Sequence, residues 1–294
     1  MSFELDTRIH AVNLERGVVE AALAGQFPGL RVLTPHEVLA SGQISLHARP
    51  DAASPQVTEA LHGEALEIVE KLADGWSWVR TLHDGYLGYV PDECLMEGNP
   101  GSPCVKTLRA HIYAEPRIQS RPLGRLSEGA SLSLLGPYEQ HGDYLWWRVK
   151  FGHGQGFVRT CETDPQNDSG GYEGVLLRYL GVPYLWGGRS AWGIDCSGFT
   201  QRMAFYPLPR DADQQQAFLP AIETPRLGDL AFFPGHVGIM LDERRMIHAN
   251  ATHMAVSIDT LGEGGYGRQL AQTLTGFGRI TEELRAAYET PDNG

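Results

Sequence analysis

The sequence predicts an α+β protein in which two small β-barrels precede a domain with helices packed on one side of an antiparallel sheet. Three observations lead to this prediction. The 294 residues include 35 glycines and 18 prolines, which is typical of short strands joined by turns. Two stretches, 64–95 and 129–161, share one order of strands and glycine turns. After residue 171, two helical segments are followed by four strand-like runs.

These changes of pattern divide the chain into four parts: an N-terminal extension at 1–40, a first barrel at 41–103, a second barrel at 104–163 and a C-terminal domain at 164–294. In the extension, an apolar stripe predicts a helix over 14–24, and its members are Leu14, Val18, Val19 and Leu23. The polar segment 163–171 lacks periodicity and predicts a linker.

The two barrel stretches resemble each other in detail. Asp-Gly pairs in the first supply the positive φ of tight hairpin turns. Aligning the stretches matches the Trp78-Val79 strand to Trp147-Arg148-Val149, and it matches Gly88-Tyr89-Val90 to Gly156-Phe157-Val158. An internal duplication of one small barrel explains this match.

Composition excludes several classes of partner. The formal net charge is −12, and Lys and Arg form no stripe that could neutralise phosphates, so we expect no nucleic-acid partner. The same acidic balance opposes binding to anionic lipid, and no apolar run of 18 residues offers a membrane span. The first 20 residues contain no apolar core of a secretory signal, so we expect a cytoplasmic protein.

The four cysteines are predicted to be thiols. They are Cys94, Cys104, Cys161 and Cys196, and no two of them form a CxxC pair. The usual spacing of zinc ligands is therefore missing, and a reducing compartment would disfavour disulfides. We expect no metal and no other cofactor.

Cys196 is the candidate nucleophile. It follows Asp195, a good N-cap, and opens an amphipathic segment, so it is expected at the N-terminus of a helix. Unpaired backbone N–H groups make that position electropositive and favour a thiolate. Gly198 would let another backbone approach closely. Considered alone, a cysteine before a helix is more often structural than catalytic.

Two histidines strengthen the catalytic interpretation. His236 opens one strand-like run, and His248 lies at the end of the next. If these runs form a hairpin around residues 243–245, the two imidazoles lie side by side on neighbouring strands. A thiolate needs a base, and that base needs a group to orient it. The alternative, two unrelated polar residues at strand ends, accounts less well for all three residues together.

Five sequence blocks resemble one family. They are "PYLWGGRSAWGIDCSGF", "LPRDADQQ", "LGDLAFF", "HVGIM" and "IHA", in this order. The C-terminal domain is similar to the NlpC/P60 family of cysteine peptidases, and the whole chain resembles the subgroup with bacterial SH3 (SH3b) domains before the peptidase. The resemblance implies SH3-like barrels, a papain-like fold and cleavage of cell-wall peptides between γ-D-glutamate and a diamino acid.

The resemblance also implies roles for residues of the C-terminal domain. Cys196 would be the nucleophile, His236 the general base and His248 the residue that orients it. Tyr184 would lie beside the thiol and help hold the oxyanion together with the Cys196 N–H. Core packing is an equally good account of Tyr184 and the better account of Trp186.

Further residues are candidates for binding substrate. Asp195 and Tyr86 would meet the free amine of an N-terminal L-alanine, with Glu64 as a weaker candidate. Ser197 and Arg210 would meet peptide carboxylates, Arg210 through its bidentate fork. The alternatives are a hairpin aromatic packed on its own barrel for Tyr86 and a solvated strand residue for Glu64.

The predicted activity is hydrolysis of the γ-D-glutamyl–diaminopimelate bond in small free muropeptides such as L-Ala-γ-D-Glu-diaminopimelate, in the recycling of cell-wall peptides. Ala212 stands where the subgroup often has serine, which affects the expected fit of the substrate. Three alternatives stay open: an exported endopeptidase of the intact wall, a non-catalytic module that binds wall peptides, and an acyltransferase with the same thiol chemistry.

Overall fold

A computed structural model describes residues 4–152, 154–164 and 170–289. The chain divides into two compact units, Met1–Gln166 and Asn167–Gly294. Of the predicted linker at 163–171, residues 165–169 lie outside the described part of the chain. No helix among the described residues is both long and apolar enough to cross a membrane.

The N-terminal segment contains strands where the apolar stripe predicts a helix. The strands are β1 (Val12–Asn13), β2 (Val18–Val19) and β3 (Arg31–Val32), and a single 3-10 turn, η1, spans Ala21–Leu23. The helix prediction is wrong because Val18 and Val19 lie on opposite faces of strand β2 and pack into two different clusters. Val19 packs with Val12 and Leu23, whereas Val18 packs against Trp78 of the first large sheet.

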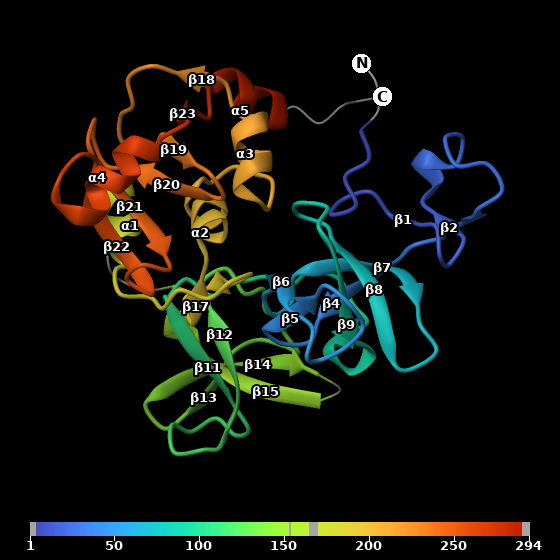
Figure 1. The fold of residues 1–294 in the computed structure, drawn as a ribbon. Helices are drawn as coiled ribbons and strands as arrows, with labels where there is room; N and C mark the ends of the chain where they lie inside the picture. Colours follow the sequence, from blue (N-terminus) through green and yellow to red (C-terminus); the bar gives the residue numbers. More distant parts are fainter. Residues whose placement is uncertain (1–3, 153, 165–169, 290–294) are drawn as a thin grey trace. The chain divides into compact units, whose positions relative to one another are not determined.

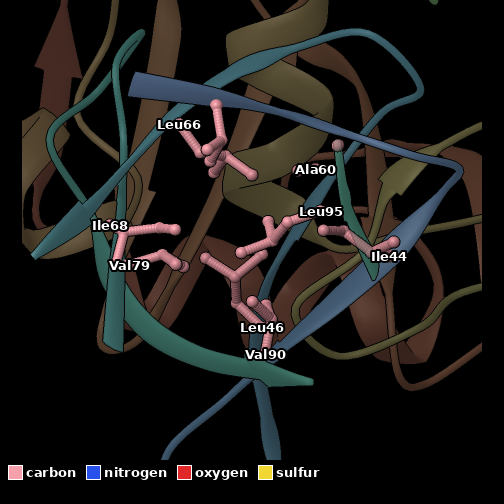
Figure 2. Close-up of a cluster of buried hydrophobic side chains, with 10 residues drawn as sticks. Ile44, Leu46, Ala60, Leu66, Ile68, Val79, Val90 and Leu95 are labelled. Carbon is pink, nitrogen blue, oxygen red and sulfur yellow. The ribbon is translucent and has the colours of Figure 1, made fainter. Parts of the chain in front are cut away.

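The first large sheet of this unit has seven strands in the order β10-β4-β7-β8-β9-β5-β6 (Figure 1). β4 lies within the range predicted as the N-terminal extension. The strands are β4 (His36–Ala40), β5 (Ile44–His47), β6 (Gln56–Ala60), β7 (Ala65–Lys71), β8 (Trp76–Thr81), β9 (Leu87–Pro91) and β10 (Leu95–Met96), and η2 spans Asp92–Cys94. Figure 2 shows aliphatic side chains of these strands packed together in one buried cluster.

The second large sheet has five strands in the order β12-β11-β15-β14-β13. They are β11 (Arg109–Tyr113), β12 (Pro122–Ser127), β13 (Glu139–His141), β14 (Tyr144–Phe151) and β15 (Gly154–Arg159), followed by η3 (Thr160–Glu162). Its own buried cluster includes Ile112, Leu126 and Val149. Each of the two sheets therefore has a separate core.

The registers of the two sheets match as the sequence alignment predicts. Val79 pairs with Gly88 in the first sheet, and Val149 pairs with Gly156 in the second. Both glycines lie where another strand crosses closely. A Cβ at Gly88 would come within 2.8 Å of the Leu46 Cβ, and one at Gly156 would overlap the Ile112 side chain. The equivalence of these strand pairs is confirmed, and their origin in an internal duplication stays a prediction.

The second unit is built on a six-stranded antiparallel sheet in the order β18-β23-β19-β20-β21-β22 (Figure 1). Its strands are β18 (Ala221–Ile222), β19 (Leu230–Phe233), β20 (His236–Met240), β21 (Arg245–Asn250), β22 (Ala255–Thr260) and β23 (Gly276–Gly278), and β16 (Arg189–Ser190) pairs with β17 (Gly193–Ile194) outside it. The helices are α1 (Gly171–Leu177), α2 (Cys196–Met203), α3 (Ala212–Phe218), α4 (Gly264–Thr273) and α5 (Glu282–Glu289).

The central strands of this sheet are covered on both faces. Consecutive residues of β20 and β21 are buried, although neighbouring side chains on a strand point to opposite sides. Leu270 of α4 packs with Met240 and Met246 on one face. Helix α2 lies against β20 and β21. The start of α2 is thus held beside the strand that begins at His236.

Candidate active site

Cys196 is the first residue of α2, as the sequence predicts. Asp195 is the N-cap, and its Oδ1 accepts a hydrogen bond of 2.7 Å from the Gly198 N–H. Gly198 is needed because a Cβ at this position would overlap the carbonyl oxygen of Gly188. The expected close approach of a second backbone is therefore confirmed, and it locks the N-terminus of the helix in place.

The Asp195 carboxylate is fully engaged within the protein. Arg210 donates two hydrogen bonds to it, Nη1 to Oδ1 at 3.0 Å and Nη2 to Oδ2 at 2.7 Å. The Gly187 N–H donates to Oδ2 at 2.8 Å, and Arg210 Nη1 also donates to Ser197 Oγ at 2.9 Å. Arg210 is only 1% exposed. The sequence assigns these three side chains to substrate, whereas the structure has them hold one another; contact with substrate stays a prediction.

Gln215 of α3 is a positioning residue that the sequence analysis missed. Its side chain is fully buried and joins two segments: Oε1 accepts from Thr200 Oγ1 at 2.7 Å, and Nε2 donates to the Pro209 carbonyl at 2.9 Å. The helix that carries it starts at Ala212 behind a capping box formed by Asp211 and Gln214. A buried glutamine carries no sequence signal that separates it from an exposed one.

The two histidines lie together on the predicted hairpin. His236 begins β20, His248 lies within β21, and Nε2 of His236 is 2.7 Å from Nδ1 of His248. Gly238 lies opposite His248 in the register, since Ile239 pairs with Ile247. A Cβ at Gly238 would come within 3.0 Å of the His248 Cβ, so glycine there leaves room for the imidazole.

Asp259 of β22 extends this pair, and the sequence analysis did not select it. Its Oδ2 is 3.0 Å from Nε2 of His248 and accepts a hydrogen bond of 3.1 Å from Ser257 Oγ. The hydrogen bond with His248 is the main reason that the pKa of the Asp259 carboxyl lies below its usual value. His236, His248 and the ionised Asp259 carboxylate therefore form one chain of hydrogen-bonded side chains.

The electrostatics of the site favour neutral groups at rest. Burial raises the pKa of the Cys196 thiol to about 12, and the Asp195 carboxylate adds to this effect, while the Val237 and Ser197 backbone N–H groups and Arg210 oppose it. Burial also lowers the pKa of His236 to about 3, with a further contribution from His248. At neutral pH the thiol keeps its proton, and His236 has an unprotonated nitrogen available.

The remaining candidates are found in different surroundings. Tyr184 is partly buried, and burial together with the nearby Cys196 and Asp195 raises the pKa of its hydroxyl to about 12. Trp186 is 65% exposed, so core packing is the wrong account of it. In the first unit, Tyr86 is buried in the turn before β9, and Glu64 accepts from the Leu61 N–H in the turn before β7. Roles of Tyr86 and Glu64 toward substrate stay predictions.

All four cysteines are free thiols, as expected. Only Cys196 combines burial with a helix N-terminus, and in the same unit His236 and His248 lie together on two neighbouring strands. A thiol at the start of a helix packed on an antiparallel sheet, with strand-borne histidines beside it, defines the class of cysteine peptidases with a papain-like core.

The chain belongs to the NlpC/P60 family, whose sequence profile matches residues 181–275. The profile of the bacterial dipeptidyl-peptidase SH3 domain matches residues 46–95. Both the family resemblance and the fold class predicted from the sequence are thereby confirmed.

Individual proteins agree with this assignment. Dipeptidyl-peptidase 6 of Lysinibacillus sphaericus is 30% identical over 263 residues, which cover 80% of this chain and 96% of that protein. Gamma-D-glutamyl-L-lysine dipeptidyl-peptidase of Bacillus cereus is 28% identical over 247 residues, covering 71% of this chain and 72% of that protein. The crystal structure of an NlpC/P60 family protein from B. cereus has the same fold, with a TM-score of 0.67 at 21% identity, over 83% of this chain and 99% of the other.

Proposed function

We propose that this chain is a cysteine peptidase that hydrolyses the γ-D-glutamyl–diamino acid bond of free muropeptides with an N-terminal L-alanine, in the recycling of cell-wall peptides. The observation that carries the proposal is the pairing of His236 with His248 in the unit that places Cys196 at the start of α2. The names of the relatives support the bond and the product, because a dipeptidyl-peptidase releases an N-terminal dipeptide.

In the proposed reaction, His236 removes the thiol proton as Cys196 Sγ attacks the γ-carbonyl of D-glutamate. A tetrahedral intermediate forms, and its oxyanion lies near the backbone N–H of Cys196, one of the unpaired N–H groups at the start of α2. The protonated His236 gives its proton to the departing amine, which leaves a thioester on Cys196. His236 then takes a proton from water, and the resulting hydroxide attacks the thioester carbonyl. The C–S bond breaks, His236 returns the proton to the Cys196 thiolate, and the γ-carboxylic acid of D-glutamate leaves and ionises in solvent.

Oxyanion stabilisation in this scheme comes from α2 and Tyr184. The tyrosine hydroxyl stays protonated over the whole working range, since its pKa is raised to about 12, and it is therefore always able to donate. Removal of one oxyanion donor costs roughly 10²–10³ in kcat in other hydrolases. We assign Asp195 to recognition of the L-alanine amine, with Tyr86 and the weaker candidate Glu64. We assign Ser197 and Arg210 to the peptide carboxylates.

Mass-spectrometric product analysis tests the proposal directly. The substrates are L-Ala-γ-D-Glu-diaminopimelate, its lysine analogue and the N-acetylated form of each, incubated with the wild type, Cys196→Ala and Cys161→Ala. Cys161 is exposed, so its removal controls for loss of a thiol. We expect L-Ala-D-Glu from the free peptides only, with wild type and Cys161→Ala, and no product with Cys196→Ala.

Other outcomes contradict specific parts of the proposal. Equal cleavage of free and acetylated peptides would remove the requirement for a free amine and favour an endopeptidase of the intact wall. Peptide binding without turnover, unchanged by Cys196→Ala, would favour a non-catalytic binding module. Transfer of the acyl group to an added amine in place of water would favour an acyltransferase.

A further inference from the structure

Three side chains lie close to the Asp259 carboxylate, and two of them form hydrogen bonds with it. His248 and Ser257 approach its Oδ2 at 3.0 and 3.1 Å, and His253 Nε2 lies 3.4 Å from the same oxygen. His248 itself is fully buried and stacks on Tyr266, with ring centroids 5.8 Å apart and 15° between the planes. The His248 imidazole is thus fixed in position. Its hydrogen-bond partners then determine which of its two ring nitrogens carries the proton.

We propose that Asp259 is a positioning residue that sets the tautomer of His248 and, through it, the tautomer of His236. The proposal deepens the proposed function, on which it rests, by giving the peptidase a fourth residue. Asp259 can only accept, so His248 carries its proton on Nε2. Its Nδ1 then has a lone pair and accepts from Nε2 of His236 across 2.7 Å. His236 is left with an unprotonated Nδ1, the nitrogen that can take the thiol proton.

The opposite tautomer fails on two counts. With the proton on Nδ1 of His248, its Nε2 lone pair would face the Asp259 carboxylate at 3.0 Å, so that two acceptors would meet. His248 would also donate to Nε2 of His236, which would place the proton of neutral His236 on Nδ1. No nitrogen would then be free to act as the base toward Cys196.

Asn250 supplies a competing donor for the opposite tautomer. Its Oδ1 accepts from the His253 N–H at 2.8 Å, which orients Nδ2 toward Ser257 Oγ at 2.8 Å and toward His248 Nε2 at 3.3 Å. A hydrogen bond to an ionised group is about twice as strong as one between neutral groups, and the contact with Asp259 is also the shorter one. The carboxylate therefore decides the tautomer as long as it is present.

This choice matters because His236 is neutral at rest. A protonated imidazole carries a proton on both nitrogens and has only one form. A neutral imidazole has one donor and one acceptor nitrogen, so two tautomers exist. Burial keeps His236 neutral. A base that is neutral before the reaction works only when its lone pair is on the nitrogen that faces the thiol.

The tautomers are read by NMR of ¹⁵N-histidine-labelled protein at pH 7.5, because protonated and unprotonated ring nitrogens have well-separated resonances. His236→Asn and His248→Asn assign the signals. We compare the wild type with Asp259→Ala, with Asp259→Ala/Asn250→Asp, which moves the carboxylate to the other neighbour of His248 Nε2, and with Glu243→Gln, an exposed turn residue. Thermal midpoints and kcat are measured for each.

We expect the Nε2–H form of both histidines in the wild type and in Glu243→Gln, and the Nδ1–H form in Asp259→Ala. The orienting carboxylate of serine peptidases is worth about 10⁴ in kcat, and we expect about 10- to 100-fold here, because the effect passes through a second imidazole. KM should stay unchanged. Asp259→Ala/Asn250→Asp should return both histidines to Nε2–H and recover most of kcat.

An Asp259→Ala variant that keeps Nε2–H and a kcat within twofold of wild type would overturn the proposal. If that variant does not fold, Asp259→Asn keeps the shape and removes the charge; mixed tautomers with a lower kcat support the proposal, and an unchanged tautomer with unchanged kcat contradicts it. Because NMR needs no substrate, a wild type that cleaves none of the peptides would contradict the proposed function while the tautomers still test Asp259.

Discussion

Cys196 lies at the electropositive end of a helix, yet its surroundings suppress its charge. Two effects compete there: the backbone N–H groups favour the thiolate, and burial beside the Asp195 carboxylate favours the thiol. Burial is the larger effect, so the thiol is protonated at neutral pH. The peptidase then depends on proton transfer to His236 during the attack and not on an ion pair formed in advance.

The reactivity of Cys196 should therefore rise continuously with pH. The pKa of this thiol is raised, so the thiolate fraction grows from neutral into alkaline solution, and we expect no plateau of reactivity below pH 6. Iodoacetamide labelling followed by peptide mass spectrometry measures this rate for Cys196, with exposed Cys161 as the internal reference. A rate that is already maximal in mild acid would show a preformed ion pair and contradict the prediction.

Arg210 is the residue whose removal should cost the most stability in the site. Its guanidinium is 1% exposed and binds Asp195 through both Nη atoms, so Arg210→Met leaves a buried carboxylate without its partner. We expect the free energy of unfolding to fall by about 3–5 kcal/mol. The control is Arg244→Met, an exposed partner of Glu263, for which about 0–1 kcal/mol is expected. Urea unfolding distinguishes the two, and equal losses would contradict a buried ion pair.

The sequence predicts the reactive residues better than the residues that hold them in place through hydrogen bonds and ion pairs. Cys196 and the two histidines could be found because short local signals, a helix start and a hairpin, place each of them. Asp259 reaches His248 across the turn between β21 and β22, and the length of a turn cannot be derived from the alternation of the strands. Arg210 appeared to be a ligand for substrate because the sequence does not reveal that its side chain is buried.

At the scale of elements, the repeated hairpin gives the clearest test of packing. A Cβ at Gly156 would overlap Ile112, whereas a Cβ at Gly154 on the same strand has only the Phe151 carbonyl oxygen within 4 Å, at 3.9 Å. Gly156→Ala should lower the free energy of unfolding by about 1–3 kcal/mol through overpacking. Gly154→Ala should change it by less than about 0.5 kcal/mol. Similar values for the two variants would show that β11 can move away.

The N-terminal segment shows why an apolar stripe can mislead. Leu14 and Val18 are one helical turn apart in the sequence, but Leu14 is 67% exposed and Val18 is fully buried. The turn at Gly17, with φ of 65°, separates them and sends the valines into a strand. The stripe is consistent with a helix, but Val18 packs with Trp78 of β8, and this contact favours the strand β2. That contact is not encoded locally.

For the whole molecule, the same buried groups set the pH range of stability. A histidine whose folded pKa is lowered binds fewer protons than in the unfolded chain, so its contribution is present above its ordinary pKa of 6.5 and is lost as the pH falls below it. His236 acts in this direction, and so does His62 of the first unit, a second histidine whose pKa is lowered by burial. A thiol whose pKa is raised has the opposite sign, and the contribution of Cys196 is lost above its ordinary value of 9.0.

We therefore expect the thermal midpoint to be highest between pH 6.5 and 9.0 and to decline on both sides. Differential scanning calorimetry across pH 5–10 measures it. His236→Asn should flatten the acid side of the profile, and Cys196→Ala should flatten the alkaline side. A midpoint that keeps rising from pH 6.5 down to pH 5 would contradict the sign of both histidine shifts.

Gly238 has a consequence for any survey that substitutes each position and scores activity. It has no side chain and takes no part in the reaction, but a methyl group there would collide with Met246 and press on His248. Such a survey would rank Gly238 beside Cys196 and report a false positive for catalysis. The double variant Gly238→Ala/Met246→Ala would reveal the error, because Met246→Ala removes the side chain with which the new methyl group collides and should restore activity. No second substitution can restore activity in the same way after the nucleophile is lost.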